Sequence, residues 1–442
     1  MGEIHKYVFV FNLCNSIIGV GILAMPFIMK QCGLILGVLM IAFCNAASRI
    51  ASRLLVDGAI HSRAHSYSTY AEAVCGKRGK VVAELCVIVF NMSTLIAFFV
   101  IIGDIGTDIV TKQMLLPNTN YTRVSVMFAI TILFVLPFSL MRDARNLSAI
   151  STFAVGVYAA LICILLAFAM PALSTKDWIG EVNFWKFSGF FHSIPIVGFA
   201  LSCQTTIFPV VESILDTNPT LVHSVVATAI NICSLLYTAS GVFGYVGLSS
   251  QPLTGDVLLS YDPTSIVIKA LKVGFLLSVA FSYPLMLFSC RSACYTLFRG
   301  RYQTPNAKSD IQVNVIPISA FRVLTIVIVS LTFVIANIVP NIEFVLGLSG
   351  SVVGSLICFI LPSIIYLRTS LAGHSRVWRR VAQIMIIYGT IILFVSTIAT
   401  LTAEHERIVE EIREDLRPVL ANNKGEHAGQ HQLAKNEKLG VS

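Results

Sequence analysis

The first apolar stretch of the chain combines polar and small residues that interrupt a helix. Asn15 and Ser16 precede Gly19 and Gly21, and Pro26 follows them. Glycine leaves the backbone unscreened and proline removes an amide donor, so we expect this helix to break near its middle. Amides at the start of the second half would lie at the positive end of a helix dipole, which suits a carboxylate. The predicted anion-binding residues are Ser16, Gly19, Val20, Gly21 and Ile22.

The same break would free carbonyl oxygens that can bind a cation. These oxygens lie around Asn15 and Ile18, and hard ligands of this kind suit sodium. Ser278 and Ser282 stand four residues apart on one face of a later apolar stretch and could complete a sodium site. The alternative is that these serines bond to their own helix backbone or pack helices closely, and it is the commoner situation.

A second interrupted stretch lies at residues 190–211. Pro195, Gly198 and Pro209 surround a run of polar residues there, so we expect a second break. The residues predicted to flank it and line the other side of the ligand are Phe199, Ala200, Ser202 and Cys203, with Gln204 beside them. No charged residue lies in the centre of either interrupted stretch, so a neutral zwitterion is the ligand that fits best.

Charged residues near the apolar stretches were weighed as a further kind of site. Asp104 and Asp108 are four residues apart, and a solvated helix end is favoured over a cation or proton vestibule. Glu84 is interpreted as interfacial. Glu343 could pair with one of two lysines, Lys269 or Lys272.

Metal chemistry and enzyme chemistry are not favoured by the remaining motifs. His61 and His65 have the spacing of a metal pair but no third ligand. The eleven cysteines lie almost all in apolar runs, where they behave as small hydrophobic residues. No nucleophile with an adjacent base and no histidine box is visible, so we expect neither catalytic residues nor an organic cofactor.

The composition excludes a water-soluble protein. Of the 442 residues, 56% are hydrophobic and only 12% are charged, whereas soluble domains carry about 25% charged residues. The mean hydropathy is +0.80. The net charge of +8 comes from short basic clusters between apolar stretches, so it reflects membrane topology and not nucleic-acid binding. A polytopic protein in a lipid bilayer is predicted, without a removable signal peptide.

Eleven apolar spans can be placed along the chain. They are 8–29, 34–58, 81–110, 124–141, 147–170, 190–211, 221–246, 264–289, 321–339, 342–367 and 378–401. Residues 1–403 are therefore interpreted as the transmembrane domain, and residues 404–442 as a short polar tail that starts with a solvated helix and ends in disorder.

The distribution of Lys and Arg predicts the orientation. Basic residues concentrate in the segments that face the cytoplasm if the N-terminus is inside. The loop with Glu212 and Asp216, which has no Lys or Arg, disagrees with this pattern. Asn120 begins an Asn-Tyr-Thr acceptor for glycosylation in a loop predicted to be outside, whereas Asn146 begins a second match that should be silent.

The two interrupted spans occupy matching positions in two halves of five spans each. Interrupted spans in corresponding positions indicate a transporter built from inverted repeats. Broken backbone at this depth is tolerated only where it lines a cavity inside the protein. The sequence therefore predicts an all-α integral membrane fold with a 5+5 inverted repeat and a peripheral eleventh span.

The motifs carry a resemblance to a known family. The run Phe11-Asn12-Leu13-Cys14-Asn15-Ser16-Ile17-Ile18-Gly19-Val20-Gly21-Ile22-Leu23 resembles the first-helix signature of the sodium-coupled neutral amino acid transporters. This is solute carrier family 38 of the amino acid/auxin permease group. Further matches are Val100 to Asp104, Cys203 to Pro209, Cys290-Arg291-Ser292 and Val345 to Ser355. The chain looks most like the member 10 branch through Met25-Pro26-Phe27, Lys30 to Gly33 and Gly354 to Ile360.

This resemblance implies a fold and an activity. The fold is the eleven-helix amino acid, polyamine and organocation (LeuT-like) type with helices 1 and 6 broken. The activity is secondary active, sodium-driven symport of small neutral amino acids such as glutamine, alanine or serine, by alternating access. The family's sodium site implies a role for Asn15 and for a hydroxyl residue of the eighth helix, which is Ser282 here, with Ser278 as the fallback. Many members have histidine where this chain has Gln204.

Two other functions were kept as alternatives. One is an amino-acid sensor or scaffold that binds ligand with little flux, and the other is a proton-coupled permease. A multi-pass protein of the plasma membrane or of an endolysosomal or Golgi membrane, with a cytoplasmic N-terminus, is expected. The sequence does not identify protein partners.

Overall fold

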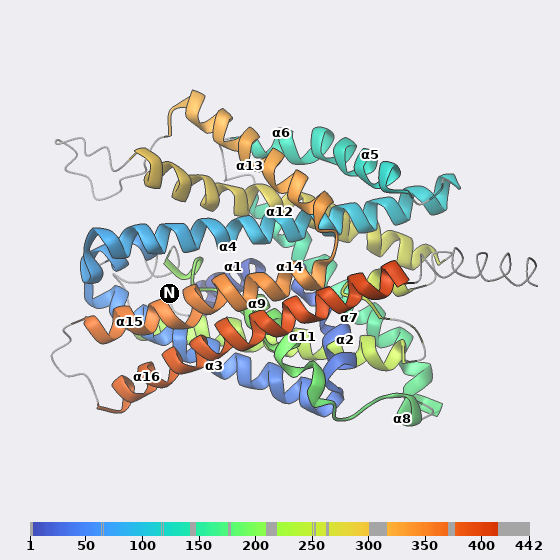
Figure 1. Cartoon of the computed structure of the whole chain (residues 1–442), viewed down its shortest axis with the longest axis horizontal. Helices are drawn as coiled ribbons and strands as arrows, with labels where there is room; N and C mark the ends of the chain where they lie inside the picture. The colour runs from blue at the N-terminus through green and yellow to red at the C-terminus, as the bar shows by residue number, and fades with distance from the viewer. Residues whose placement is uncertain are drawn as a thin grey trace, which may run out of the picture.

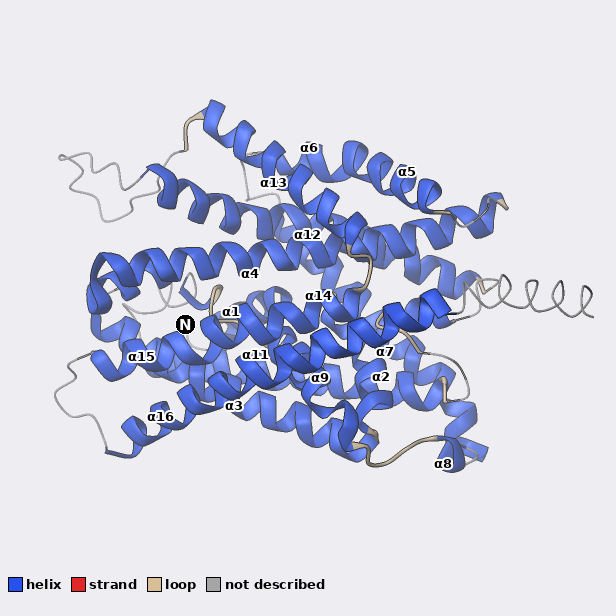
Figure 2. Cartoon of the chain, in the orientation of Figure 1, coloured by secondary structure: helices blue, strands red, loops and turns tan. Residues whose placement is uncertain are grey.

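The chain folds into helices, because a membrane leaves backbone groups no partner except one another. The computed structural model describes residues 3–413 apart from 63, 65, 116, 118, 142–146, 176–177, 209–218, 250, 252, 262–264, 300–315 and 370–375. No strand occurs in this described part, and every element drawn in Figure 2 is helical. The predicted all-α class is therefore confirmed.

The helices follow one another with short connections. In the first half of the chain they are α1 (Glu3–Ile17), α2 (Gly21–Cys32), α3 (Leu34–Ser62), α4 (Tyr67–Met114), α5 (Asn120–Ile130), η1 (Thr131–Val135), α6 (Leu136–Ser139), α7 (Leu147–Thr175), α8 (Trp178–Glu181), η3 (Phe187–Gly189) and α9 (Phe190–Ala200). In the second half they are α11 (Pro219–Gly247), η4 (Val257–Ser260), α12 (Ile266–Arg299), α13 (Ile318–Ile338), α14 (Ile342–Ser349), η5 (Gly350–Ile360), α15 (Leu361–Arg368), α16 (Arg376–Ile391) and η6 (Ile392–Ser396). The segments η1, η5 and η6 are π-helical, and η3 and η4 are 3-10 turns.

The helices coincide with the eleven predicted spans. In the described part, nine helices are long and apolar enough to cross a membrane, and the bent pair α1 and α2 makes a tenth. The shorter apolar helix Phe187–Ala200 stands at the predicted sixth span. The chain is thus a multi-pass membrane protein.

Two helices extend beyond the predicted spans. The fourth helix begins at Tyr67, where Ser66 and Thr69 form a capping box, and it continues through a kink at Gly76, whose φ is 69°. Capping and the left-handed freedom of glycine therefore carry this helix over a basic segment that the apolar pattern leaves out. The last helix runs from Arg376 to Arg413, so the predicted tail helix continues the eleventh span.

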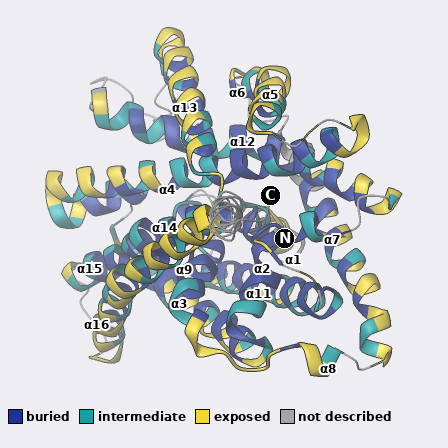
Figure 3. Ribbon diagram, turned by 45° about the vertical axis from the view of Figure 1, so that its right-hand side comes forward, coloured by how far each residue is buried: buried dark blue, intermediate teal, exposed yellow. Residues whose placement is uncertain are grey.

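The two interrupted spans lie inside the bundle. α2 has ten of its twelve residues buried, and α9 packs against α2, α3, α14 and η5. α11 packs against α1, α2, α3 and α7, while α12 packs against α4 and α7. Figure 1 shows this arrangement, and Figure 3 shows exposed residues concentrated on outer helices such as α5, α13 and α16. A continuous lipid-facing helix would not be buried on all sides.

Candidate functional site

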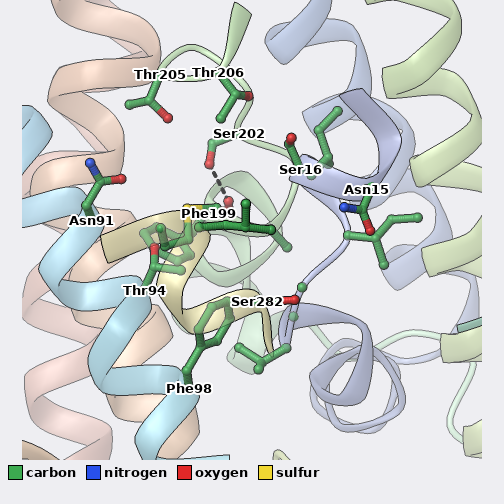
Figure 4. A pocket seen from close by; sticks show the side chains of 18 of the residues that line it. Asn15, Ser16, Asn91, Thr94, Phe98, Phe199, Ser202, Thr205, Thr206 and Ser282 are labelled. Atoms are coloured by element: carbon green, nitrogen blue, oxygen red, sulfur yellow. Dashed lines mark hydrogen bonds between the residues drawn. The ribbon is translucent and has the colours of Figure 1, made fainter. Parts of the chain in front are cut away.

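A cavity of about 400 Å³ lies where the two interrupted spans meet. Its walls come from α1, α2, α4, α7, α9, α11, α12 and α14. Figure 4 shows Asn15 and Ser16 on one side and Asn91, Thr94 and Phe98 of α4 on the other. The cavity therefore joins segments that are far apart in the sequence.

The first break exposes backbone as predicted. α1 and α2 meet at an angle of 64°. The Ile18 amide still donates to the Cys14 carbonyl at 2.8 Å, and the Ile22 amide bonds to the Gly19 carbonyl at 3.4 Å. Within the described residues, no backbone amide bonds to the carbonyl of Asn15 or of Ile18. These two oxygens are therefore available beside the cavity.

Tyr237 of α11 connects the two breaks. Its buried hydroxyl lies 3.0 Å from the Ile17 carbonyl at the end of α1 and 3.1 Å from the Ala200 carbonyl at the end of α9, and it can donate to either. One turn further on, Ser240 donates to the Ile22 carbonyl at 3.0 Å. The freed carbonyls of both broken spans are thus satisfied by one neighbouring helix, as a membrane interior requires.

The second break follows α9 directly. The helix ends at Ala200, and residues 201–206 are not helical. Ser202 folds back on the Phe199 carbonyl, with its hydroxyl at 2.6 Å and its amide at 3.1 Å. From α3, Ser48 donates to the Leu201 carbonyl at 2.9 Å, and the hydroxyl of Ser52 lies 3.4 Å from the Cys203 thiol. The predicted break is present, and α3 holds it in place.

Glycine is required at one of the two predicted positions by close packing. A Cβ at Gly21 would lie 2.8 Å from the Cβ of Ala200, so only glycine lets α2 and α9 approach this closely. A Cβ at Gly19 would lie 3.8 Å from Phe98, which is ordinary contact across the cavity. Gly21 therefore sets the distance between the broken spans, whereas Gly19 leaves room in the cavity.

The walls are mostly apolar and include a few polar side chains. The apolar residues are Phe90, Phe98, Phe199, Leu285, Met286 and Leu346, and the rings of Phe90 and Phe199 are 4.7 Å apart. The Asn91 amide donates to Ser289 at 3.2 Å, and its buried oxygen has no hydrogen-bond partner among the described residues. No Asp, Glu, Lys, Arg or His lines the cavity. Neutral polar groups in an apolar wall fit an uncharged side chain.

Most residues predicted for the carboxylate and substrate line this cavity, but two do not. Ser16, Gly19, Val20, Gly21, Phe199, Ala200 and Ser202 line it. Ile22 is fully buried in α2 behind the cavity wall. Cys203 is also buried, and its amide and thiol are engaged by Gln204 and Ser52. Both lie on the side of the break that packs against the bundle.

The residues predicted for the cation are placed in a similar way. Asn15, Ile18 and Ser282 line the cavity, and the buried Oδ1 of Asn15 has no hydrogen-bond partner among the described residues. Ser282 donates to the Ser278 carbonyl at 2.8 Å, which is the alternative weighed from the sequence. Ser278 is fully buried and does not line the cavity. Both serine side chains lie next to the phenol of Tyr158.

Several lining residues were not predicted. They are Asn12, Phe90, Asn91, Thr94, Phe98, Tyr158, Thr205, Thr206, Tyr237 and Ser289. On α4 a usable signal existed, because Phe90, Asn91, Thr94 and Phe98 follow helical spacing and place two polar groups on one face of an apolar span. Tyr237 gave no such signal, since it resembles any other aromatic residue of an apolar run.

The acidic residues of α4 are not a solvated helix end. The side chains of Asp104 and Asp108 are only 18% and 13% exposed. Asp104 accepts a hydrogen bond from Arg123 at 2.9 Å, and Asp108 binds the buried Lys272 at 2.6 Å and also Lys112. The preferred interpretation was therefore wrong, because tertiary packing covers this helix end.

Glu343 binds a backbone amide and neither of the two predicted lysines. Its carboxylate accepts from the Gly255 amide, and Lys272 is engaged by Asp108. Glu84, interpreted as interfacial, is buried with 3% exposure. Pairing of such charges depends on tertiary proximity, which spacing in the sequence does not contain.

Asp256 lies in the connection between α11 and α12 and faces the same charged group. Burial raises the pKa of Asp256 to about 7, and the nearby Asp104 and Asp108 raise it further, while the Leu258 amide and Lys272 act in the opposite direction. The Leu258 amide donates to one carboxyl oxygen at 2.9 Å. This carboxyl therefore changes charge near neutral pH.

The remaining motifs have the following positions. Asn120 is exposed at the start of α5. His65, Asn146, Pro209, Glu212 and Asp216 lie outside the described residues. Among the described residues, no group of three or more His, Cys, Asp and Glu side chains could hold a metal ion.

Sequence comparison identifies similar proteins. The family model described as transmembrane amino acid transporter protein matches residues 7–402. Solute carrier family 38 member 10 of Rattus norvegicus is 33% identical over 403 residues, covering 91% of this chain and 36% of the relative. The Homo sapiens protein of the same name is 33% identical over 407 residues, covering 92% and 35%. This chain spans about a third of the length of these relatives, and the predicted resemblance to the family 38 member 10 branch is confirmed.

A third relative matches over most of its own length. Sodium-coupled neutral amino acid transporter 7 of Danio rerio is 26% identical over 414 residues, which cover 90% of this chain and 87% of the relative. All three relatives are solute carriers or transporters by name, in keeping with the prediction of a transporter and not an enzyme.

Two solved structures share the fold. A crystal structure of MhsT in complex with L-phenylalanine has a TM-score of 0.51 at 15% identity and covers 89% of this chain and 96% of its own. The manganese transporter of Eremococcus coleocola has a TM-score of 0.55 at 9% identity, with 90% and 88% covered. The predicted LeuT-like transporter fold is thereby confirmed.

Proposed function

The chain belongs to the transmembrane amino acid transporter family, and from this premise we propose that it moves small neutral amino acids across a membrane by sodium-coupled alternating access. Glutamine, alanine and serine are the expected kind of substrate. The observation that carries the proposal is the meeting of two broken helices at one cavity that no charged side chain lines.

The substrate's α-carboxylate is placed at the first break. The amides that open α2, around Gly19, Val20 and Gly21, lie at the positive end of its dipole beside the cavity. The α-ammonium is placed at the end of α9, where the carbonyls of Phe199 and Ala200 stand at the negative end of that helix. Two oppositely charged backbone ends favour a zwitterion without any charged side chain.

The substrate's side chain is placed between α4, α9 and α12. Phe98 and Phe199 supply apolar surface, while Asn91, Thr94 and Ser289 supply neutral hydrogen-bonding groups. A charged side chain would lose its hydration here without an ion-pair partner, which costs several kcal/mol. This supports a neutral substrate.

The sodium ion is placed between α1 and α12. The ligands proposed are the Asn15 side chain, the Ile18 carbonyl and the Ser282 hydroxyl, with Ser278 in reserve. The unbonded Ile18 carbonyl and the unpartnered Asn15 oxygen support this choice, since both are hard oxygen donors. Ser282 would have to release its bond to the Ser278 carbonyl or use its second lone pair.

Uptake into proteoliposomes tests the proposal. Labelled glutamine and alanine are supplied with an inward sodium gradient or an equal potassium gradient, at two pH values. Asn15→Ala and Ser282→Ala should raise the sodium concentration for half-maximal uptake by about tenfold, the effect of losing about 1.4 kcal/mol. Ser363→Ala is the matched control, because Ser363 is a buried serine with the same bond to its own helix, at 2.7 Å to Phe359, and does not line the cavity.

The other outcomes point to the two alternatives. Accumulation driven by a pH gradient without sodium would identify a proton-coupled permease. Saturable binding without accumulation would identify a sensor or scaffold. Equal effects of Ser282→Ala and Ser363→Ala would remove Ser282 from the cation site.

A further inference from the structure

A second pocket, of about 280 Å³, lies away from the transport cavity between α3, α11 and α16. Its lining residues are Ala46, Arg49, Ile50, Ser52, Arg53, Val56, His223, Val226, Ala227 and Trp378. It is formed by the last part of α3 and the first turns of α11 and α16. These turns lie toward the end of the bundle where α1 begins (Figure 1), which the basic residues predict to be cytoplasmic.

Two arginines in this pocket have unused hydrogen-bond donors. Arg49 and Arg53 stand four residues apart on one face of α3. Toward the described residues, Arg49 makes one long hydrogen bond, at 3.5 Å to Asn231, and Arg53 makes none. A guanidinium carries five N–H donors in a planar fork that matches a phosphate. The pocket is therefore rich in donors for an anion.

The neighbouring groups hold Arg53 in place without neutralising the pair. Its guanidinium lies 4.2 Å from the centre of the Trp378 ring. Asp57, 3.8 Å from Arg53, is bound at its other oxygen by His223 at 2.9 Å. One carboxylate thus faces two arginines, and a net positive charge remains in the pocket.

The surface next to the pocket is apolar and faces lipid. On α3, Leu39 and Phe43 are 53% and 51% exposed, and with Ala46 and Ile50 they follow the helical spacing of one face that leads into the pocket. On α16, Ile384 and Ile387 are about 60% exposed, and this helix is largely exposed in Figure 3. A free anion would need no such surface, whereas acyl chains would.

We propose that this pocket binds the phosphate-bearing headgroup of an anionic glycerophospholipid, with its acyl chains lying along the exposed faces of α3 and α16. Basic pockets between membrane helices at the cytoplasmic interface suit such headgroups. The pocket shares no lining residue with the transport cavity. It does share α3 with the second break, since Ser48 and Ser52, the neighbours of Arg49 and Arg53 in sequence, hold the segment after α9.

Lipid titration of the purified full-length chain tests this proposal. The probes are dioctanoyl phosphatidylserine and a dioctanoyl phosphatidylinositol phosphate in mixed micelles, with dioctanoyl phosphatidylcholine and inorganic phosphate as comparison ligands. We expect saturable binding of at least one anionic lipid, and binding at least about tenfold weaker in Arg49→Gln/Arg53→Gln. The matched control is Arg379→Gln/Arg380→Gln, which removes the same charge from exposed arginines of α16 that do not line the pocket, and should change the affinity less than about twofold.

A second variant keeps the test independent of charge and folding. Ala46→Trp should fill the pocket mouth and weaken lipid binding while both arginines remain. Equal binding of phosphatidylcholine, equal binding of inorganic phosphate alone, or equal loss in the control pair would each overturn the proposal. Retained lipid binding in Arg49→Gln/Arg53→Gln, with an unchanged melting temperature, would do the same.

Discussion

Replacing Gly21 with alanine tests the closest contact between the two broken spans. The new Cβ would lie 2.8 Å from the Cβ of Ala200 and 3.5 Å from its Cα. Carbon atoms in contact prefer about 3.5–4.0 Å, so α2 and α9 would have to separate by roughly 1 Å at this point. Inserting a methyl group into a packed interior costs about 1–3 kcal/mol.

The consequence should appear in both stability and transport. We expect Gly21→Ala to lower the melting temperature of the purified protein. We also expect a fall of roughly 5- to 150-fold in the ratio of maximal uptake rate to KM, which corresponds to about 1–3 kcal/mol. The reason is that the carboxylate-binding amides and the end of α9 both move with the contact. Initial rates of labelled alanine uptake and a thermal melt of the same preparation measure the two effects.

Two other glycines supply matched controls. Gly156→Ala adds a methyl group to α7 where nothing lies within 4 Å, so it should leave both readouts unchanged. Gly19→Ala places its methyl group 3.8 Å from Phe98 inside the cavity, so it should raise KM without lowering the melting temperature. Wild-type uptake and stability in Gly21→Ala would refute the reasoning, as would equal losses in all three variants.

Four further changes have defined expectations. Tyr237→Phe removes the hydroxyl beside Ile17 and Ala200 and should cost about 1–3 kcal/mol of stability, seen as a lower melting temperature. Asp256, whose pKa rises from 3.8 to about 7 in the folded chain, holds a proton between these pH values that the unfolded chain lacks. Stability should therefore fall as pH rises through this window, and melts at pH 5.5 and 8 should show a flatter dependence in Asp256→Asn. Arg123→Met leaves Asp104 without its partner and should destabilise by about 1–3 kcal/mol, and adding Asp104→Asn should restore part of this loss in a double-mutant melt. Asn120 is exposed, so Asn120→Gln should abolish a glycosidase-sensitive shift on gels if this end faces the lumen or the outside, and an unchanged glycosylated band would contradict the orientation.

The broken spans could be predicted because their cause is local. Gly19, Gly21 and Pro26 alter the backbone of their own helix, and Pro195 with the polar run after Phe199 does the same in the second half. The seven cavity-lining residues of the predicted substrate set follow from these breaks alone. Ile22 and Cys203 were misplaced because the exposed side of a broken segment depends on the helices packed around it.

Contacts between distant helices could not be predicted. Tyr237 lies 220 residues from Ile17, and nothing in its apolar surroundings marks it. The expected pairing of Glu343 with a lysine failed for the same reason, since Lys272 lies beside Asp108 of α4. Helical spacing identifies the polar face of one span, as at Asn91 and Thr94, but not the span that it faces.

The support given by α11 to the first break also constrains how the protein is made. Tyr237 is synthesised 220 residues after Ile17, which takes roughly 10–45 s at about 5–20 residues per second. During that time the freed carbonyls of the first span have no partner in α11, and unsatisfied backbone in lipid costs several kcal/mol per group. We expect the nascent first span to enter the membrane as an unbroken helix, and cysteine cross-linking of ribosome-bound chains of increasing length should detect its bending only once α11 has left the ribosome. The transport site would then be completed late in biogenesis, by a helix from the other half of the chain.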